Sequence, residues 1–131
     1  MAELSCEQFQ SAVSEYLIRH RSILDVMSKF QEASARTNRA VAKAVTSCGC
    51  LEVSARRQRF PEDVALSDIK RLVDSHLSGD LCPDCREALE TEIGQTLFYL
   101  AALCALVDMN LDEIMAKEFS RLTMLGIFNL T

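Results

Sequence analysis

Residues that interrupt helices are scarce in this chain, and their scarcity constrains the fold more than any other feature. The 131 residues include four glycines and two prolines, and the segment from Ser5 to Ser47 contains neither. Because glycine and proline disfavour helix interiors most strongly, long uninterrupted helices are permitted over most of the sequence. We therefore predict an all-α fold, a helical bundle of four to five helices in a single domain over residues 1–131.

The segment before Gly49 is predicted to form either two helices or one kinked helix. Ser5 and Gln8 have the spacing of a capping box, and Ser22 followed by Asp25 offers a second helix start. Gly49 is a natural terminator for the second part. One narrow apolar stripe, suited to close packing against another helix, recurs at steps of three and four: Met27, Phe30, Ser34, Thr37, Val41 and Ala44.

Beyond Gly49 the sequence predicts an irregular basic connection, with a short extended piece at Leu51–Val53, and then three more helices. The first is expected from Ser67 to Leu77, with His76 or Leu77 facing inward and Gly79 as its terminator. The second is expected from Pro83, which suits a first helical turn, to Val107. It is apolar nearly all round and is therefore predicted to lie in the middle of the structure, with one main face: Leu89, Ile93, Leu97, Leu100, Cys104 and Val107.

The last predicted helix begins at an Asn110 cap, with Glu113 three residues on, and ends near Leu125 and Gly126. The tail that follows, IFNLT at residues 127–131, is apolar. We expect it to fold back onto the core or onto a partner subunit. Together with the apolar central helix, this tail suggests a homodimer.

Four of the six cysteines occur in two close pairs, Cys48-Gly-Cys50 and Cys82-Pro-Asp-Cys85. A tetrahedral metal needs four soft ligands that converge at about 2.3 Å, and ligands close in sequence meet half of that geometry locally. The second turn also directs amide hydrogens toward its thiolates. Since the set has no histidine and no position for water, we predict a structural zinc ion held by all four cysteines.

Other states of these cysteines stay open at this point. They could hold an iron–sulfur cluster, remain inert thiols, or carry a low-pKa thiolate for redox chemistry at the start of the helix after Cys82. Cys6 and Cys104 are predicted to be packing residues. His76 is interpreted as a core or boundary histidine rather than as a ligand.

Charge and composition exclude several function classes. The net charge is −5, and the positive residues are concentrated between Arg19 and Arg59, whereas most of the acidic residues follow Phe60. The basic run at residues 56–59 is too short to indicate a nucleic-acid interface, and the whole chain has only two tyrosines and no tryptophan to stack on bases. The N-terminus lacks a signal-peptide pattern, and the longest apolar run is about half the length of a bilayer span. We expect a soluble, cytoplasmic protein without membrane association.

Residues 90–119, ETEIGQTLFYLAALCALVDMNLDEIMAKEF, open a helix with glutamates, continue through an apolar segment and end in a Leu-Asp-Glu helix. This stretch resembles the MazG-like all-alpha nucleotide pyrophosphohydrolase superfamily, and residues 29–45, KFQEASARTNRAVAKAV, match it more loosely. The resemblance implies a helical bundle, usually dimeric. It also implies magnesium bound by carboxylates and cleavage of a nucleoside triphosphate between its alpha and beta phosphates.

The carboxylate motif of that superfamily is incomplete in this chain. The resemblance implies Glu32 and Glu92 as catalytic carboxylates, whereas Gln31, Ala35 and Gln95 stand where further acids are expected. Magnesium favours several oxygen ligands, so two acids make a poor site. Glu32 could instead pair with a basic residue one turn on. A pocket for an anion or nucleotide is predicted beside Glu92: Asn38, Arg39, Lys43 and Gln95.

Three functions follow, in order of preference. The first is a non-catalytic, zinc-stabilised helical protein that binds a partner or a small ligand. The second is a divergent, magnesium-dependent nucleoside triphosphate pyrophosphohydrolase that uses Glu32 and Glu92. The third is a thiol-redox or metal-sensing protein that works through Cys82 and Cys85.

Overall fold

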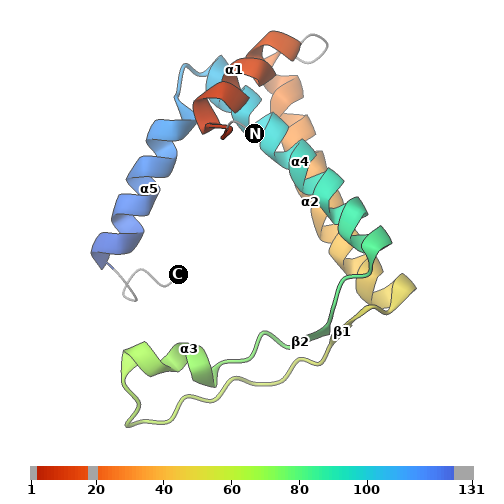
Figure 1. Ribbon diagram of the computed structural model, residues 1–131, viewed down its shortest axis with the longest axis vertical. Helices are drawn as coiled ribbons and strands as arrows, with labels where there is room; N and C mark the ends of the chain where they lie inside the picture. The colour runs from red at the N-terminus through yellow and green to blue at the C-terminus, as the bar shows by residue number, and fades with distance from the viewer. Residues whose placement is uncertain (1–2, 18–20, 126–131) are drawn as a thin grey trace.

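The computed structural model describes residues 3–17 and 21–125 and is mostly helical, as predicted (Figure 1). The predicted tail at residues 127–131 lies outside the described residues. In chain order the elements are α1 (Cys6–Tyr16), α2 (Ile23–Lys43), the π-helical turn η1 (Ala44–Cys48), β1 (Leu51–Val53), the 3-10 turn η2 (Leu66–Asp68), α3 (Ile69–Leu72), β2 (Leu77–Gly79), α4 (Pro83–Leu106) and α5 (Leu111–Leu125).

The first segment forms two helices rather than one kinked helix. Ser5 caps α1 with the predicted capping box, since its hydroxyl accepts from the Gln8 backbone and the Gln8 side chain accepts from the Ser5 N–H. Ser22 stands at the N-cap of α2 in extended conformation. At the far end Gly49 adopts a φ of 83°, the left-handed conformation that favours glycine, and ends the helix as predicted.

Helices α2 and α4 run antiparallel and side by side along most of their length (Figure 1). The face that α2 buries agrees with the predicted stripe at Thr37 and Ala44 and is shifted by one residue from Met27 and Ser34. Val26 and Ala33 are buried, and Thr37 shares a hydrogen bond of 3.0 Å with Thr96 of α4. Met27 and Val41, which the prediction placed inward, are exposed.

The hydrophobic core lies at the end of the α2–α4 pair that α1 covers. Buried residues from three helices meet there, with partly buried aromatic and aliphatic side chains around them. Alanines supply the α4 side of this cluster, so α1 and α2 can pack closely against it. The buried members are Val13, Leu17, Val26, Ala101 and Ala102.

The predicted helix from Ser67 to Leu77 is wrong beyond its first turns. The structure forms η2 and the short α3, and β2 then pairs antiparallel with β1 in the register Leu51↔Gly79 and Val53↔Leu77. Gly79 therefore lies in a strand, at a φ of 89°, instead of ending a helix. The extended piece predicted at Leu51–Val53 is confirmed as β1.

Long-range hydrogen bonds explain why that helix stops. Residues 54–76, which we call the arm, connect the two strands. Within the arm, the Gln58 side chain accepts from the Asp74 backbone N–H at 3.1 Å and donates to the Asp74 carbonyl at 2.6 Å. Asp74 also accepts from the His76 N–H at 2.9 Å, and His76 has a φ of 61°. These bonds fold residues 74–76 into a turn that a helix could not accommodate.

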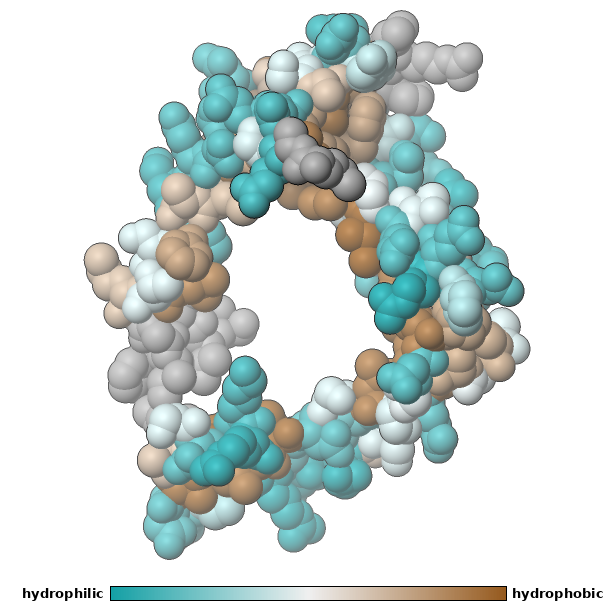
Figure 2. Space-filling view, viewed as in Figure 1, coloured by the Kyte–Doolittle hydropathy of each residue, from teal (hydrophilic) through white to brown (hydrophobic). Residues whose placement is uncertain are grey.

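Helix α4 is not enclosed, contrary to the prediction that it lies in the middle of the structure. Ile93 and Leu97 are 43% and 48% exposed, although Cys104 on the same predicted face is buried. Helix α5 begins at the predicted Asn110 cap, which accepts from the Glu113 N–H at 3.2 Å. It diverges from α4, so α5, the α2–α4 pair and the arm form an open frame (Figures 1 and 2). Among the described helices, none is long and apolar enough to cross a membrane.

Candidate metal centre

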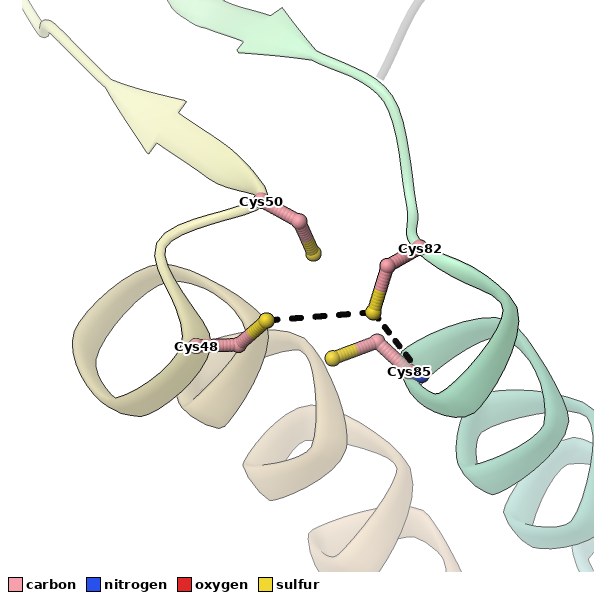
Figure 3. Close-up of side chains that lie close together, drawn as sticks. All are labelled: Cys48, Cys50, Cys82 and Cys85. Atoms are coloured by element: carbon pink, nitrogen blue, oxygen red, sulfur yellow. Dashed lines mark hydrogen bonds between the residues drawn. The ribbon is translucent and has the colours of Figure 1, made fainter.

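The two predicted cysteine pairs converge at the end of the α2–α4 pair opposite the core. The Sγ atoms of Cys48, Cys50, Cys82 and Cys85 all lie within 4.8 Å of one another, and their side chains point toward a common centre (Figure 3). Among the described residues, this is the one group of cysteine, histidine and acidic side chains with the spacing for a metal ion.

Local backbone structure aims each pair at this centre. The π-helical turn η1 places Cys48 at the end of α2, and left-handed Gly49 reverses the chain so that Cys50 faces back toward it. Cys82 is the N-cap of α4, and its sulfur accepts a hydrogen bond from the Cys85 N–H at 3.4 Å. The predicted direction of an amide hydrogen toward a thiolate in this turn is thereby confirmed.

The spacing of Cys48 and Cys82 fits two ligands of one tetrahedral ion rather than a disulfide. The Sγ atoms of Cys48 and Cys82 are 3.7 Å apart. A tetrahedron with metal–sulfur bonds of about 2.3 Å has sulfur–sulfur edges of about 3.8 Å, whereas a disulfide requires about 2.05 Å. The chemistry and spacing of the donors therefore suit a thiophilic ion that takes four sulfur ligands.

The thiols differ in acidity, and their hydrogen bonds give the reason. The Cys85 backbone N–H, followed by the Cys85 thiol, lowers the pKa of Cys82 to about 7. The Cys82 sulfur and then partial desolvation raise the pKa of Cys85 to about 12. The Cys50 N–H and the Cys85 thiol lower the pKa of Cys48, but the Cys82 and Cys50 thiols and desolvation raise it overall. The close approach of the thiols thus disfavours ionisation of several of them at once, and a bound cation would instead favour their ionised forms.

The two-stranded sheet supports the centre from the side of the arm. Leu51 follows Cys50 directly, and it pairs with Gly79, three residues before Cys82. A Cβ at Gly79 would overlap the carbonyl oxygen of Cys50. Glycine is therefore required at this position, both by its positive φ and by the close approach of the Cys50 backbone.

A cavity of about 720 Å³ adjoins the cysteine cluster between α2 and α4. Cys48 and Cys85 form part of its wall, and basic and acidic side chains form most of the rest. Among the predicted pocket residues, Arg39 and Lys43 line this cavity, Gln95 lines a neighbouring cavity of about 310 Å³, and Asn38 is exposed and lines neither. The larger cavity is lined by Glu32, Arg36, Arg39, Ala40, Lys43, Ser47, Cys48, Asp84, Cys85, Ala88 and Glu92.

Glu32 and Glu92, the carboxylates implied by the resemblance, face each other across the α2–α4 pair and line both cavities. The Arg36 side chain bridges them, with Nη1 at 3.3 Å from Glu32 and Nε at 3.5 Å from Glu92. Lys29, the largest influence, and Arg36 lower the pKa of the Glu32 carboxyl. A guanidinium thus holds the position between the two acids that a divalent cation would need.

The remaining sequence candidates lie apart from the cysteine cluster. Cys104 is buried in α4, as predicted for a packing residue, and the half-buried Cys6 contacts the Met115 sulfur of α5. His76 is half-buried in the turn before β2, where its Nε2 lies 3.3 Å from the Gln58 side chain. Its predicted helical environment is wrong because that helix does not form.

Sequence reasoning missed the bridge from Arg36 to Glu92, the position of Asp84 in the cavity wall and the close approach of Gly79 to Cys50. Arg36 could be paired with Glu32 from the spacing of four residues, but its second partner is 56 positions away and has no local signal. Asp84 lies between the two cysteines of its turn, which could have placed it near the site. The chain matches no known family model, and neither a curated protein nor a solved structure is significantly similar to it.

Proposed function

We propose that this protein is a non-catalytic, zinc-stabilised helical protein that binds a small ligand beside its metal centre. The observation that carries this proposal is the convergence of four thiols, from two pairs separated by 34 positions, within 4.8 Å. Zinc is favoured over other ions because it prefers four thiolates in a closed tetrahedral site. The MazG-like resemblance is retained as a proposal about the ancestry of the helical pair.

The distribution of buried residues supports a structural role for the ion. The main apolar cluster lies at the α1 end of the α2–α4 pair. At the opposite end, the buried hydrophobic residues among those described are Ala44 and Leu51. A metal ion there would hold α2, β1 and α4 together where hydrophobic packing is sparse, as structural zinc does in small domains.

Two cations in the wall of the cavity favour a small anionic ligand there, because Glu32 and Glu92, two of the three acids in that wall, are already paired with Arg36. Arg39 and Lys43 project into the cavity from successive turns of α2. A zinc ion with four thiolates carries a net charge of about −2, so these cations would also offset the charge of the centre. Ligand binding is tested by titration with inorganic pyrophosphate, and Lys43→Ala and Arg39→Ala should each weaken it. Unchanged affinity in both variants would refute the pocket.

The zinc proposal is tested by the metal content of protein purified without chelator or metal-affinity resin, together with a count of reactive thiols. We expect one zinc per chain, protection of the four clustered thiols, and intense visible absorption after cobalt substitution, which is typical of tetrahedral thiolate sites. Cys82→Ser should lose the metal, and the matched control Cys6→Ser should retain it. Metal-free protein with all thiols reactive would refute the proposal and favour the thiol-redox function. The lowered pKa of Cys82 is the observation that supports that function.

A divergent pyrophosphohydrolase is the second candidate, and the meeting of Glu32 with Glu92 beside the cavity favours it. The Arg36 bridge opposes it, because the two acids are already paired with a cation. Pyrophosphate release from nucleoside triphosphates in the presence of magnesium tests this activity. Pyrophosphate release by the wild-type protein that Glu92→Gln abolishes would establish the activity. Wild-type release no faster than that of the variant would exclude it.

A further inference from the structure

The described part of the arm encloses no hydrophobic core. None of its described residues is buried, and Phe60 and Leu72 are 56% and 46% exposed. Figure 1 shows the arm projecting from the cysteine end of the α2–α4 pair, with the two-stranded sheet at its base. Such an extension adds little to packing within the chain, and projecting segments of this kind commonly carry binding functions.

Side-chain bonds nevertheless fix the arm in one shape. Arg56 and Gln58 lie in the limb that follows β1, and both bind Asp74 in the limb that returns to β2. The Arg56 guanidinium lies 2.6 Å from the Asp74 carboxylate, and the Gln58 amide forms two bonds with the Asp74 backbone. The first limb therefore runs extended beside the second (Figure 1). A surface that is formed before binding loses less entropy when a partner docks on it.

The outer edge of β1 has unpaired backbone groups. Among the described residues β1 pairs with β2 alone, and in the same register the Ser54 N–H donates to the His76 carbonyl at 2.9 Å. Bonded and non-bonded pairs alternate along an antiparallel ladder, so the N–H and C=O of Val53 point away from β2. An exposed strand edge is a template for another extended segment. The edge of β2 is shorter, because the left-handed turn at His76 ends it.

Two arginines continue this edge and give it a positive charge. Successive side chains of an extended segment point to opposite sides. Since the side chains on either side of Arg57 reach Asp74, Arg57 and Arg59 point away from Asp74. Both are exposed, and neither has a hydrogen bond or ion pair with another described residue. Residues 53–60 include no acid, so this edge is complementary to a segment that carries carboxylates two residues apart.

We propose that the outer edge of β1 together with residues 54–59, which we call the docking edge, binds an extended acidic segment of a partner protein. The segment adds a third strand to the β1–β2 sheet. Its backbone pairs with the outward groups of Val53, and its carboxylates pair with Arg57 and Arg59. The exposed ring of Phe60 follows directly and offers an apolar contact. The proposal does not depend on the identity of the metal or on the ligand of the cavity.

A short peptide fits the docking edge better than a nucleic acid does. Glu62 and Asp63 are exposed just beyond Phe60, so a long polyanion that continued past Arg59 would meet two carboxylates. The chain as a whole carries a net charge of −5, which repels a polyphosphate. Two free guanidinium groups match a short acidic peptide, whereas a nucleic acid is commonly held by more phosphate contacts than that.

The test is an NMR titration of the isotope-labelled full chain with a synthetic peptide of alternating glutamate and valine. We expect the backbone amide signals of residues 51–59 to shift and the Val53 amide to exchange more slowly with solvent. Arg57→Glu combined with Arg59→Glu should weaken binding by at least about tenfold. Val53→Pro, which removes an outward N–H at an edge position, should do the same. The control Lys70→Glu reverses an exposed cation elsewhere on the arm and should leave the affinity unchanged.

A matched peptide of alternating lysine and valine and a single-stranded DNA oligonucleotide separate the outcomes. The proposal is overturned if the glutamate peptide does not bind, if the lysine peptide binds equally well, or if the arginine double variant binds as wild type does. Tighter binding of the oligonucleotide, lost in the same variant, overturns it in favour of a nucleic-acid partner. Metal content is measured on the same samples, so that binding of the glutamate peptide by metal-free wild type supports the docking edge and refutes only the zinc centre.

Discussion

If the four cysteines hold the proposed zinc ion, its removal should lower the stability of this protein by an amount that follows from the positions of the cysteines. The ion would join Cys48 to Cys82, which are 34 positions apart. A cross-link that closes a loop of that length removes about 4 kcal/mol of chain entropy from the unfolded state at 25 °C. With an unfolding entropy of roughly 2.1 cal/mol/K per residue over 131 residues, this loss corresponds to a fall in Tm of about 15 °C.

Differential scanning calorimetry measures this effect directly. The protein is compared before and after chelation at one fixed concentration, because self-association would make Tm depend on concentration. Cys82→Ser should start from the lower Tm and show no further response to chelator. Cys6→Ser should respond as wild type does, since Cys6 lies outside the cluster.

The reasoning would fail if chelation removed the metal and Tm fell by less than about 3 °C, which corresponds to under 1 kcal/mol for a chain of this size. Such a result would mean that α2 and α4 hold together at the cysteine end without the ion. It would leave a binding role for the metal but would refute its structural role.

Two further predictions concern Gly79 in β2 and Asp74 in the arm. Gly79→Ala should lower the free energy of unfolding by about 2 kcal/mol and weaken metal binding, because its Cβ would overlap the Cys50 carbonyl at positive φ. The control Gly49→Ala, also at positive φ but in open space, should cost less in chemical denaturation; equal costs would contradict the steric argument. The backbone N–H of His76 and the guanidinium of Arg56 hold the pKa of the Asp74 carboxyl below its usual range. The stabilising effect of this carboxylate is therefore present above about pH 4 and is lost as pH falls through the lowered pKa. Arg56→Ala should raise that pKa in an NMR titration, and an unchanged value would show that the ion pair at 2.6 Å has no influence on the carboxyl.

Local chemistry accounts for the parts of the fold that could be predicted. The capping box at Ser5, the left-handed Gly49, Pro83 in the first turn of α4 and the Asn110 cap all act within a few residues of the helix end that they determine. Such signals can be recognised in the sequence because the residues that form each cap are close to one another along the chain. The helix expected at residues 67–77 does not form beyond its first turns because interactions between residues distant in sequence prevent it. Its apolar spacing was a local signal, and the bonds from Gln58 to Asp74, 16 positions away, prevailed over it.

The sequence by itself determined the helical class, most helix ends and the four cysteines as candidate ligands, because caps and short ligand turns are local devices. Only the tertiary structure decided that the two cysteine pairs meet, since packing of α2 on α4 brings together residues 34 positions apart. It also decided that Arg36 separates Glu32 from Glu92. Periodicity shows that a stripe of α4 is apolar, but which neighbour covers it depends on how the helices pack, and here Ile93 and Leu97 stay exposed.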